Sequence, residues 1–156
     1  MHPKSFNGLE EFLGHDVAYV FDLSSFEEKE GFYWNNQSLL ENRENKEKIY
    51  FPSESSKNLP NKSNFLSYDF MDDFFCRIYD LIYEGFSKSD PFNRMSEQTS
   101  HLVFASYALS TEFEDVFLAT NNGDVLKGSK KLNRFQESSP LRVFYKTDND
   151  NFYPFR

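Results

Sequence analysis

The sequence predicts an α+β fold, in which a mostly antiparallel sheet is packed by one long amphipathic helix and a short N-terminal helix. The first observation is that apolar residues recur at helical spacing between about 67 and 85. The second is that the strand candidates near the C-terminus are joined by short turns, which pair strands antiparallel. A length of 156 residues fits a single domain over 1–156.

The N-terminal segment predicts the short helix. Asn7 is a candidate N-cap, Glu10 and Glu11 stand near the positive end of the helix dipole, and Gly14 ends the helix. The stretch "DVAYVFDL" follows with alternating character and predicts a strand. A second short strand is expected at "GFYW", residues 31–34.

Residues 35–64 form a long polar segment, rich in Asn, Ser, Lys and Glu. The apolar patch around "IYF" predicts one strand at 48–52, with a loop on each side. Loops of this length within a domain are usually mobile or functional. We therefore expect a mobile polar insertion at about 35–64.

The helix predicted at 67–85 has an apolar face that is expected to form core. Ser67 is a candidate N-cap and Gly85 a candidate C-terminal stop. The expected core face consists of large apolar side chains spaced by one or three residues: Phe70, Met71, Phe74, Phe75, Ile78, Leu81 and Ile82.

The second half of the chain predicts the rest of the sheet. "SHLVFASYAL", residues 100–109, is apolar on both sides and predicts a central strand. Residues 116–127 predict a hairpin around Asn122-Gly123. "LRVFYKT" predicts a last clear strand, and "FYPF" is expected to run back beside it after the turn "DNDN".

The sequence contains no evident catalytic or metal-binding motif, and we expect no catalytic residue, no metal site and no cofactor. His2, His15 and His101 lack partners at metal-ligand spacing. Cys76 has no neighbour that would make it a nucleophile. The basic run 127–134 is more typical of a solvated loop than of a nucleic-acid contact.

The net charge of −8 disfavours nucleic acid and anionic membranes as partners and favours basic proteins. No apolar run is long enough to span a membrane. The single cysteine excludes an internal disulfide and fits a reducing compartment. We therefore expect a cytoplasmic protein.

These features favour an acidic binding protein that neutralises a basic protein partner. Its profile is that of a bacterial immunity protein or antitoxin that inhibits a toxin domain of the nuclease type. The alternatives are a phage-type nucleic-acid mimic that acts against a defence system, or a small enzyme or ligand-binding protein whose site is assembled from distant residues. The candidate partner-binding residues are acids and aromatics: Asp69, Asp73, Asp80, Glu84, Tyr79, Tyr83, Trp34, Glu112, Glu114 and Asp115.

Overall fold

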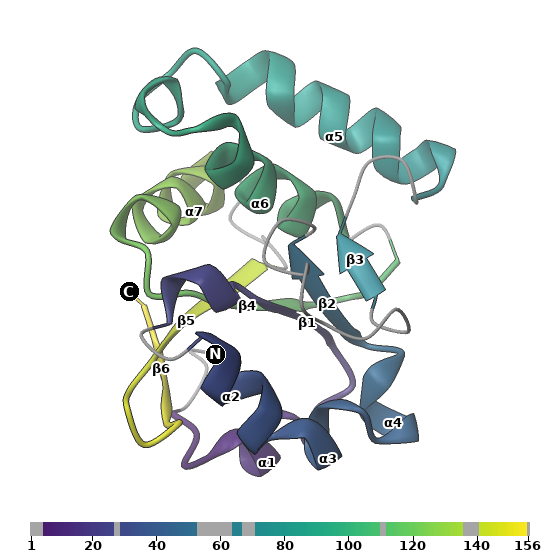
Figure 1. Ribbon diagram of the computed structural model, residues 1–156. Coiled ribbons are helices and arrows are strands. Elements are labelled where there is room, and N and C mark those ends of the chain that lie inside the picture. The colour runs from purple at the N-terminus through teal and green to yellow at the C-terminus, as the bar shows by residue number, and fades with distance from the viewer. Residues whose placement is uncertain are drawn as a thin grey trace.

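The computed structural model describes residues 5–26, 29–52, 64–66, 71–109, 112–135 and 141–155. Within these residues a six-stranded sheet has the strand order β3-β2-β1-β4-β5-β6. Helices cover both faces of the sheet, so the fold has three layers (Figure 1). The strands are β1 (Ala18–Phe21), β2 (Ile49–Pro52), β3 (Asn64–Leu66), β4 (Val116–Ala119), β5 (Leu141–Lys146) and β6 (Phe152–Pro154).

The prediction of a mostly antiparallel α+β sheet is wrong. β5 and β6 pair antiparallel, and the other neighbouring strands pair parallel. The central strands β1 and β4 are buried at every position. Continuous burial is typical of parallel strands that are covered by helices on both faces.

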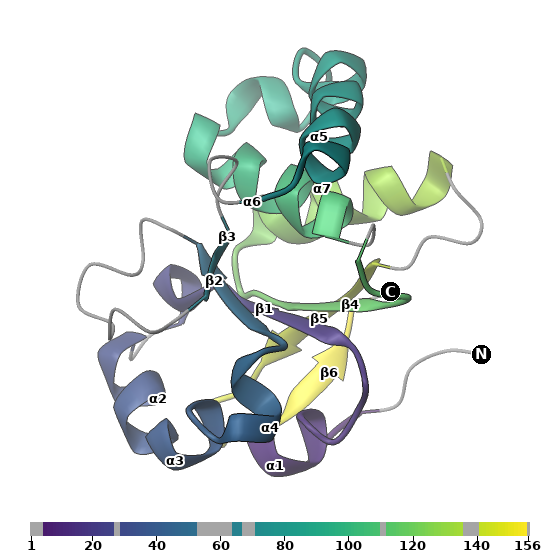
Figure 2. The same ribbon diagram turned by 90° about the vertical axis from the view of Figure 1, so that its right-hand side faces the viewer.

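The helices form two groups on opposite faces of the sheet, and Figure 2 shows the same division from the side. One group consists of α1 (Leu9–Phe12), α2 (Lys29–Asn35), α3 (Gln37–Leu40) and α4 (Arg43–Lys46). The other consists of α5 (Asp73–Phe86), α6 (Glu97–Ala108) and α7 (Gly123–Phe135). In the described part of the chain, the short 3-10 turns η1 (Leu23–Ser25) and η4 (Phe92–Arg94) lie in the connections.

Several predicted elements are confirmed. The short N-terminal helix is α1, although its N-cap position is Gly8 and not Asn7. The strands expected within 16–23, at 48–52, at 116–120 and at 141–147 correspond to β1, β2, β4 and β5. The return of the C-terminal segment beside β5 is confirmed by β6, which pairs with β5 across a turn at 147–151.

Three other predicted elements are wrong. Residues 31–34, expected as a strand, lie in α2. Residues 100–109, expected as the central strand, lie almost entirely in α6. The expected hairpin around Asn122 does not form, because the chain enters α7 at Gly123. Asn122 instead accepts hydrogen bonds from the backbone N–H groups of Asp124 and Val125, as an N-cap does.

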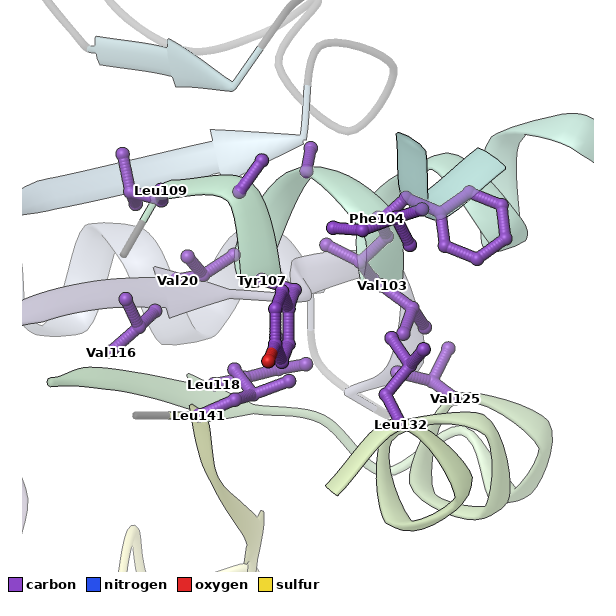
Figure 3. Packing of buried hydrophobic residues seen from close by; sticks show 14 of the residues in the cluster. Val20, Val103, Phe104, Tyr107, Leu109, Val116, Leu118, Val125, Leu132 and Leu141 are labelled. Atoms are coloured by element: carbon purple, nitrogen blue, oxygen red, sulfur yellow. The ribbon is translucent and has the colours of Figure 1, made fainter. Parts of the chain in front are cut away.

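The position of α6 explains why its sequence resembles a strand. α6 packs against α5, α7 and the sheet, and Figure 3 shows Val103, Phe104 and Tyr107 among side chains of the strands and of α7. Its residues from Leu102 to Ala108 are all buried. A helix that is apolar all round has no polar face, so the period that identifies a helix is absent.

The long helix is shorter than predicted and exposes part of its expected core face. α5 begins after the N-cap Asp72, whose Oδ1 accepts a hydrogen bond from Phe75 N at 2.8 Å. Phe75 and Ile82 are buried, whereas Phe74 and Leu81 are 55% and 62% exposed. α5 is the outermost helix of its layer in Figures 1 and 2, so only one side of it can reach the core. Ser67, Asp69 and Phe70 lie outside the described residues.

The polar segment at 35–64 contains more regular structure than expected. Residues 37–40 and 43–46 form α3 and α4, and Asn42 caps α4 by accepting a hydrogen bond from Glu44 N at 3.0 Å. Residues 53–63 lie outside the described residues, so the mobility of this segment stays a prediction. In the part of the chain that the structure describes, no helix has the length and apolar character needed to cross a membrane.

Candidate functional site

The carboxyl ends of β1 and β4 define a topological switch point. These two strands are neighbours in the sheet, but the chain leaves them toward opposite faces. After β1 it continues through η1 and α2 on one face, and after β4 it continues through α7 on the other. Diverging connections leave a crevice outside the strand ends, and this is where ligands of open α/β sheets bind.

Asp22 lies at this crevice, directly after β1, and is 4% exposed. Its Oδ2 accepts a hydrogen bond from Thr120 Oγ1 at 2.8 Å, and its Oδ1 accepts one from Ser24 Oγ at 2.9 Å. Burial raises the pKa of the Asp22 carboxyl above its ordinary value, while the hydroxyl hydrogen bonds act in the opposite direction. A single carboxylate therefore joins the ends of the two central strands.

Further hydrogen bonds hold the two connections together. Ser25 Oγ accepts a hydrogen bond from Asn121 N at 2.8 Å, and Thr120 Oγ1 accepts one from Asn122 N at 3.1 Å. The side chain of Asn121 also bonds to the backbone N–H and carbonyl of Lys146 in β5. The polar groups at this edge of the sheet are thus hydrogen-bonded to neighbouring backbone and side chains.

A cleft of about 750 Å³ opens at this point, and we call it the switch-point cleft. Its volume is in the range of about 300–1,000 Å³ that is usual for small-molecule sites. One wall comes from the strand ends and the start of α7: Asp22, Ser24, Pro52, Asn122 and Val125. The other wall comes from α5, η4 and α6: Tyr79, Tyr83, Ser87, Phe92, Asn93, Met95, Glu97, Gln98, Thr99, Ser100, His101, Leu102 and Phe104.

Aromatic rings make up much of the second wall. Tyr79 stacks on Tyr83 with ring centroids 6.4 Å apart, and both rings stand edge-on to Phe104. The hydroxyl of Tyr79 and Nδ1 of His101 are hydrogen-bonded at 2.8 Å. Phe92 packs on Phe104, with ring centroids 4.8 Å apart. These contacts hold the rings in place without a ligand.

Close packing of α7 against η4 supports the aromatic side of the cleft. A Cβ atom at Gly128 would lie 2.7 Å from Cε1 of Phe92 and 3.2 Å from Cε of Met95, so the absence of a side chain permits the approach. Phe92 and Met95 both line the cleft. The shape of the cleft therefore depends on the packing of α7 against η4.

The structure brings some of the predicted partner-binding residues together. Asp73, Asp80 and Glu84 are exposed, and their spacing places them along one side of α5. We call these three residues the acidic strip. Tyr79 and Tyr83 lie on the same helix and line the switch-point cleft.

The other predicted residues that the structure describes belong neither to the acidic strip nor to the lining of the cleft. Glu112, Glu114 and Asp115 precede β4, and Glu112 reaches the N-terminus of α5, where a hydrogen bond with Asp72 raises the pKa of the Glu112 carboxyl. Trp34 is 47% exposed on α2, on the opposite face of the sheet from α5. Asp69 lies outside the described residues.

Sequence reasoning missed Asp22 and Asn122 as site residues. The available signal was that two short apolar segments, "YVF" and "VFLA", are each followed directly by small polar residues. Such residues meet at one edge if the strands are parallel, whereas the apparent tight turns favour antiparallel strands. The turn after β1 reads "DLSS" and contains no glycine, so it does not match the dinucleotide-binding fingerprint.

Comparisons of the chain with protein-family models, with curated proteins and with solved structures give no match. Among the described residues, no group of three or more His, Cys, Asp or Glu side chains is placed to hold a metal ion.

Proposed function

We propose that this protein binds a small organic molecule in the switch-point cleft. The observation that carries the proposal is the position of the cleft, which opens where the connections from β1 and β4 diverge, with Asp22 and Asn122 at the strand ends. In open α/β sheets this position is the preferred ligand site. A site of this kind is assembled from residues that lie far apart in the sequence.

The lining supports a ligand with both apolar and polar parts. Tyr83, which is half exposed, and Tyr79 offer ring surface and are packed on the buried ring of Phe104. Asp22 and Asn122 offer polar groups at the strand ends. Small-molecule sites typically combine a mostly apolar lining with a few convergent polar groups. An aromatic or aliphatic body would lie on the rings, and its polar groups would face the strand ends.

A variant that fills the cleft tests this proposal. Gln98 is exposed on the first turn of α6 and lines the cleft, so we expect Gln98→Trp to fold normally and to occupy ligand space. In a thermal-shift screen of small polar metabolites, a ligand at a concentration of about 100 Kd should stabilise the native protein by about 2.7 kcal/mol. We expect this stabilisation to be lost in Gln98→Trp.

The matched control is Gln37→Trp, because Gln37 begins α3 in the helical layer on the other face of the sheet. It should respond to ligands as the native protein does. Compounds that stabilise Gln98→Trp and the native protein equally would show that ligands bind outside the cleft and would contradict the proposal.

A second candidate function is neutralisation of a basic cytoplasmic protein, such as a bacterial toxin domain, by the acidic strip. The observation that favours it is that Phe74 and Leu81, both exposed, lie along one side of the aligned carboxylates of Asp73 and Asp80 on α5. Acidic groups beside exposed apolar anchors suit a positively charged protein surface. The single cysteine of the chain fits action in a reducing compartment such as the cytoplasm.

Charge reversal tests the second candidate. Asp73→Lys combined with Asp80→Lys should slow association with a basic partner captured from the source cell by about tenfold at low salt, because complementary charge accelerates encounter. Surface plasmon resonance over a salt series measures this rate. Glu44→Lys in α4, combined with Glu47→Lys at its C-cap, is the matched control and should leave the association rate unchanged. Association that is indifferent to salt and to the reversal on α5 would refute the electrostatic contact.

A further inference from the structure

The charge of the switch-point cleft is one-sided. Asp22 and Glu97 contribute carboxylates to its lining, and no lysine or arginine is among the described residues that line it. The ion pairs found among the described residues join Arg94 to Asp90 and Lys146 to Asp150, so neither involves Asp22. The Asp22 carboxylate is therefore buried without a counter-charge from those residues.

A buried carboxylate without a cation is unfavourable unless another group compensates its charge. The hydroxyls of Thr120 and Ser24 each donate one hydrogen bond to it. An ionised carboxylate can accept about four hydrogen bonds, so capacity for a ligand donor remains. The raised pKa of Asp22, which burial causes, agrees with a carboxylate that lacks a charged partner.

The aromatic wall adds a second attraction for positive charge. The rings of Tyr79 and Tyr83 line the cleft and are packed edge-on to the buried ring of Phe104. Ring faces carry negative electrostatic potential and attract ammonium, amidinium or guanidinium groups. A planar cation on these rings would share the cleft with the Asp22 carboxylate, which is a hydrogen-bond acceptor for its N–H groups.

The helix N-termini at the cleft do not reverse this preference. The first turns of α6 and α7 border the cleft, and free N-terminal amides would favour anions. Ser96 Oγ, however, already accepts a hydrogen bond from Thr99 N, and Asn122 Oδ1 accepts hydrogen bonds from two backbone N–H groups of α7. Glu97 also places a negative charge in the first turn of α6.

We infer that the switch-point cleft selects a small organic cation, with the Asp22 carboxylate as its counter-charge and the aromatic wall as its stacking surface. This inference rests on the proposed ligand-binding function. It specifies the charge of the ligand, and a separate measurement can therefore contradict it.

Benzamidine, benzamide and benzoate provide the test, because they share one ring and carry a positive, zero and negative charge at pH 7. Their Kd values can be measured by NMR titration of the 15N-labelled protein. We expect benzamidine to bind about tenfold more tightly than benzamide, in line with a desolvated cation–π contact and an ionic hydrogen bond. Benzoate should bind most weakly.

Asp22→Asn should remove the preference, so that benzamidine weakens about tenfold and benzamide keeps its affinity. Asp16→Asn removes one exposed carboxylate before β1, away from the cleft lining, and should preserve the preference. Equal binding of benzamidine and benzamide, stronger binding of benzoate, or no binding of the three probes would each overturn the inference. The proposed function is judged separately, by whether Gln98→Trp abolishes the stabilisation found in the metabolite screen.

Discussion

Replacing Phe75 with alanine should lower the free energy of unfolding by about 3–5 kcal/mol, which is the usual cost of removing a buried phenylalanine ring. Phe75 is fully buried and belongs to the core cluster that α5, α6, α7 and the sheet form together. Its ring also stacks on Tyr79 with centroids 6.4 Å apart. Chemical denaturation of the purified variant measures the loss directly.

The neighbouring residue is the matched control. Phe74 has the same side chain on the same helix but is 55% exposed, so Phe74→Ala should cost less than about 1 kcal/mol. Similar losses in the two variants, or a larger loss in Phe74→Ala, would mean that α5 packs by a different face. The comparison thus tests the orientation of the helix that carries Tyr79 and Tyr83 into the cleft.

Thr120→Val should destabilise the protein by about 1–3 kcal/mol, although valine has nearly the same shape as threonine. Thr120 is fully buried, and its hydroxyl both donates to Asp22 and accepts from Asn122 N. The substitution leaves a buried carboxylate oxygen and a backbone N–H without this partner. In an Asp22→Asn background the loss should be smaller, because the oxygen is no longer charged.

Asp22→Asn itself should stabilise the protein at pH 7, by about 1 kcal/mol, as substitutions at functional sites often do. Because burial raises the pKa of Asp22 in the folded state, the native protein holds its proton more tightly than the unfolded chain does. Ionisation therefore costs stability as the pH rises from the unfolded pKa, about 3.9, through the folded pKa. The advantage of Asp22→Asn should be smallest near pH 4 and constant above the folded pKa.

Denaturation of both proteins over this pH range measures the difference. An Asp22→Asn variant that is less stable than the native protein at pH 7 would show that the carboxylate is retained for structure. That result would contradict the view that the Asp22 carboxylate lowers the stability of the protein and is present for ligand binding.

The strands could largely be predicted from the sequence, but their directions could not. "AYVF", "IYF", "VFLA" and "LRVFYK" are short apolar runs next to turn residues, and each forms a strand. Direction depends on whether a helix separates consecutive strands. The apolar character of α6 on all sides and the Asn122-Gly123 pair at the start of α7 both conceal a helix, so parallel connections resemble tight turns in the sequence.

The candidate site could not be predicted from the sequence for the same reason. Thr120 and Asp22 are 98 residues apart in the sequence and meet because β1 and β4 are adjacent and parallel. Neither residue belongs to a motif, and each resembles an ordinary polar residue at the end of a strand. By contrast, the exposed acids of α5 could be predicted, because helical spacing within one segment determines their alignment.

Crystals soaked with a chemically diverse set of small fragments would show directly where this protein binds ligands, because electron density locates each bound fragment whatever the natural ligand is. We expect fragments to accumulate in the switch-point cleft, which is lined by Asp22 and Asn122 at the strand ends and by the rings of Tyr79 and Tyr83. An empty cleft, with fragments instead gathered on the exposed side of α5 around Phe74 and Leu81, would contradict it and would favour the protein-binding function.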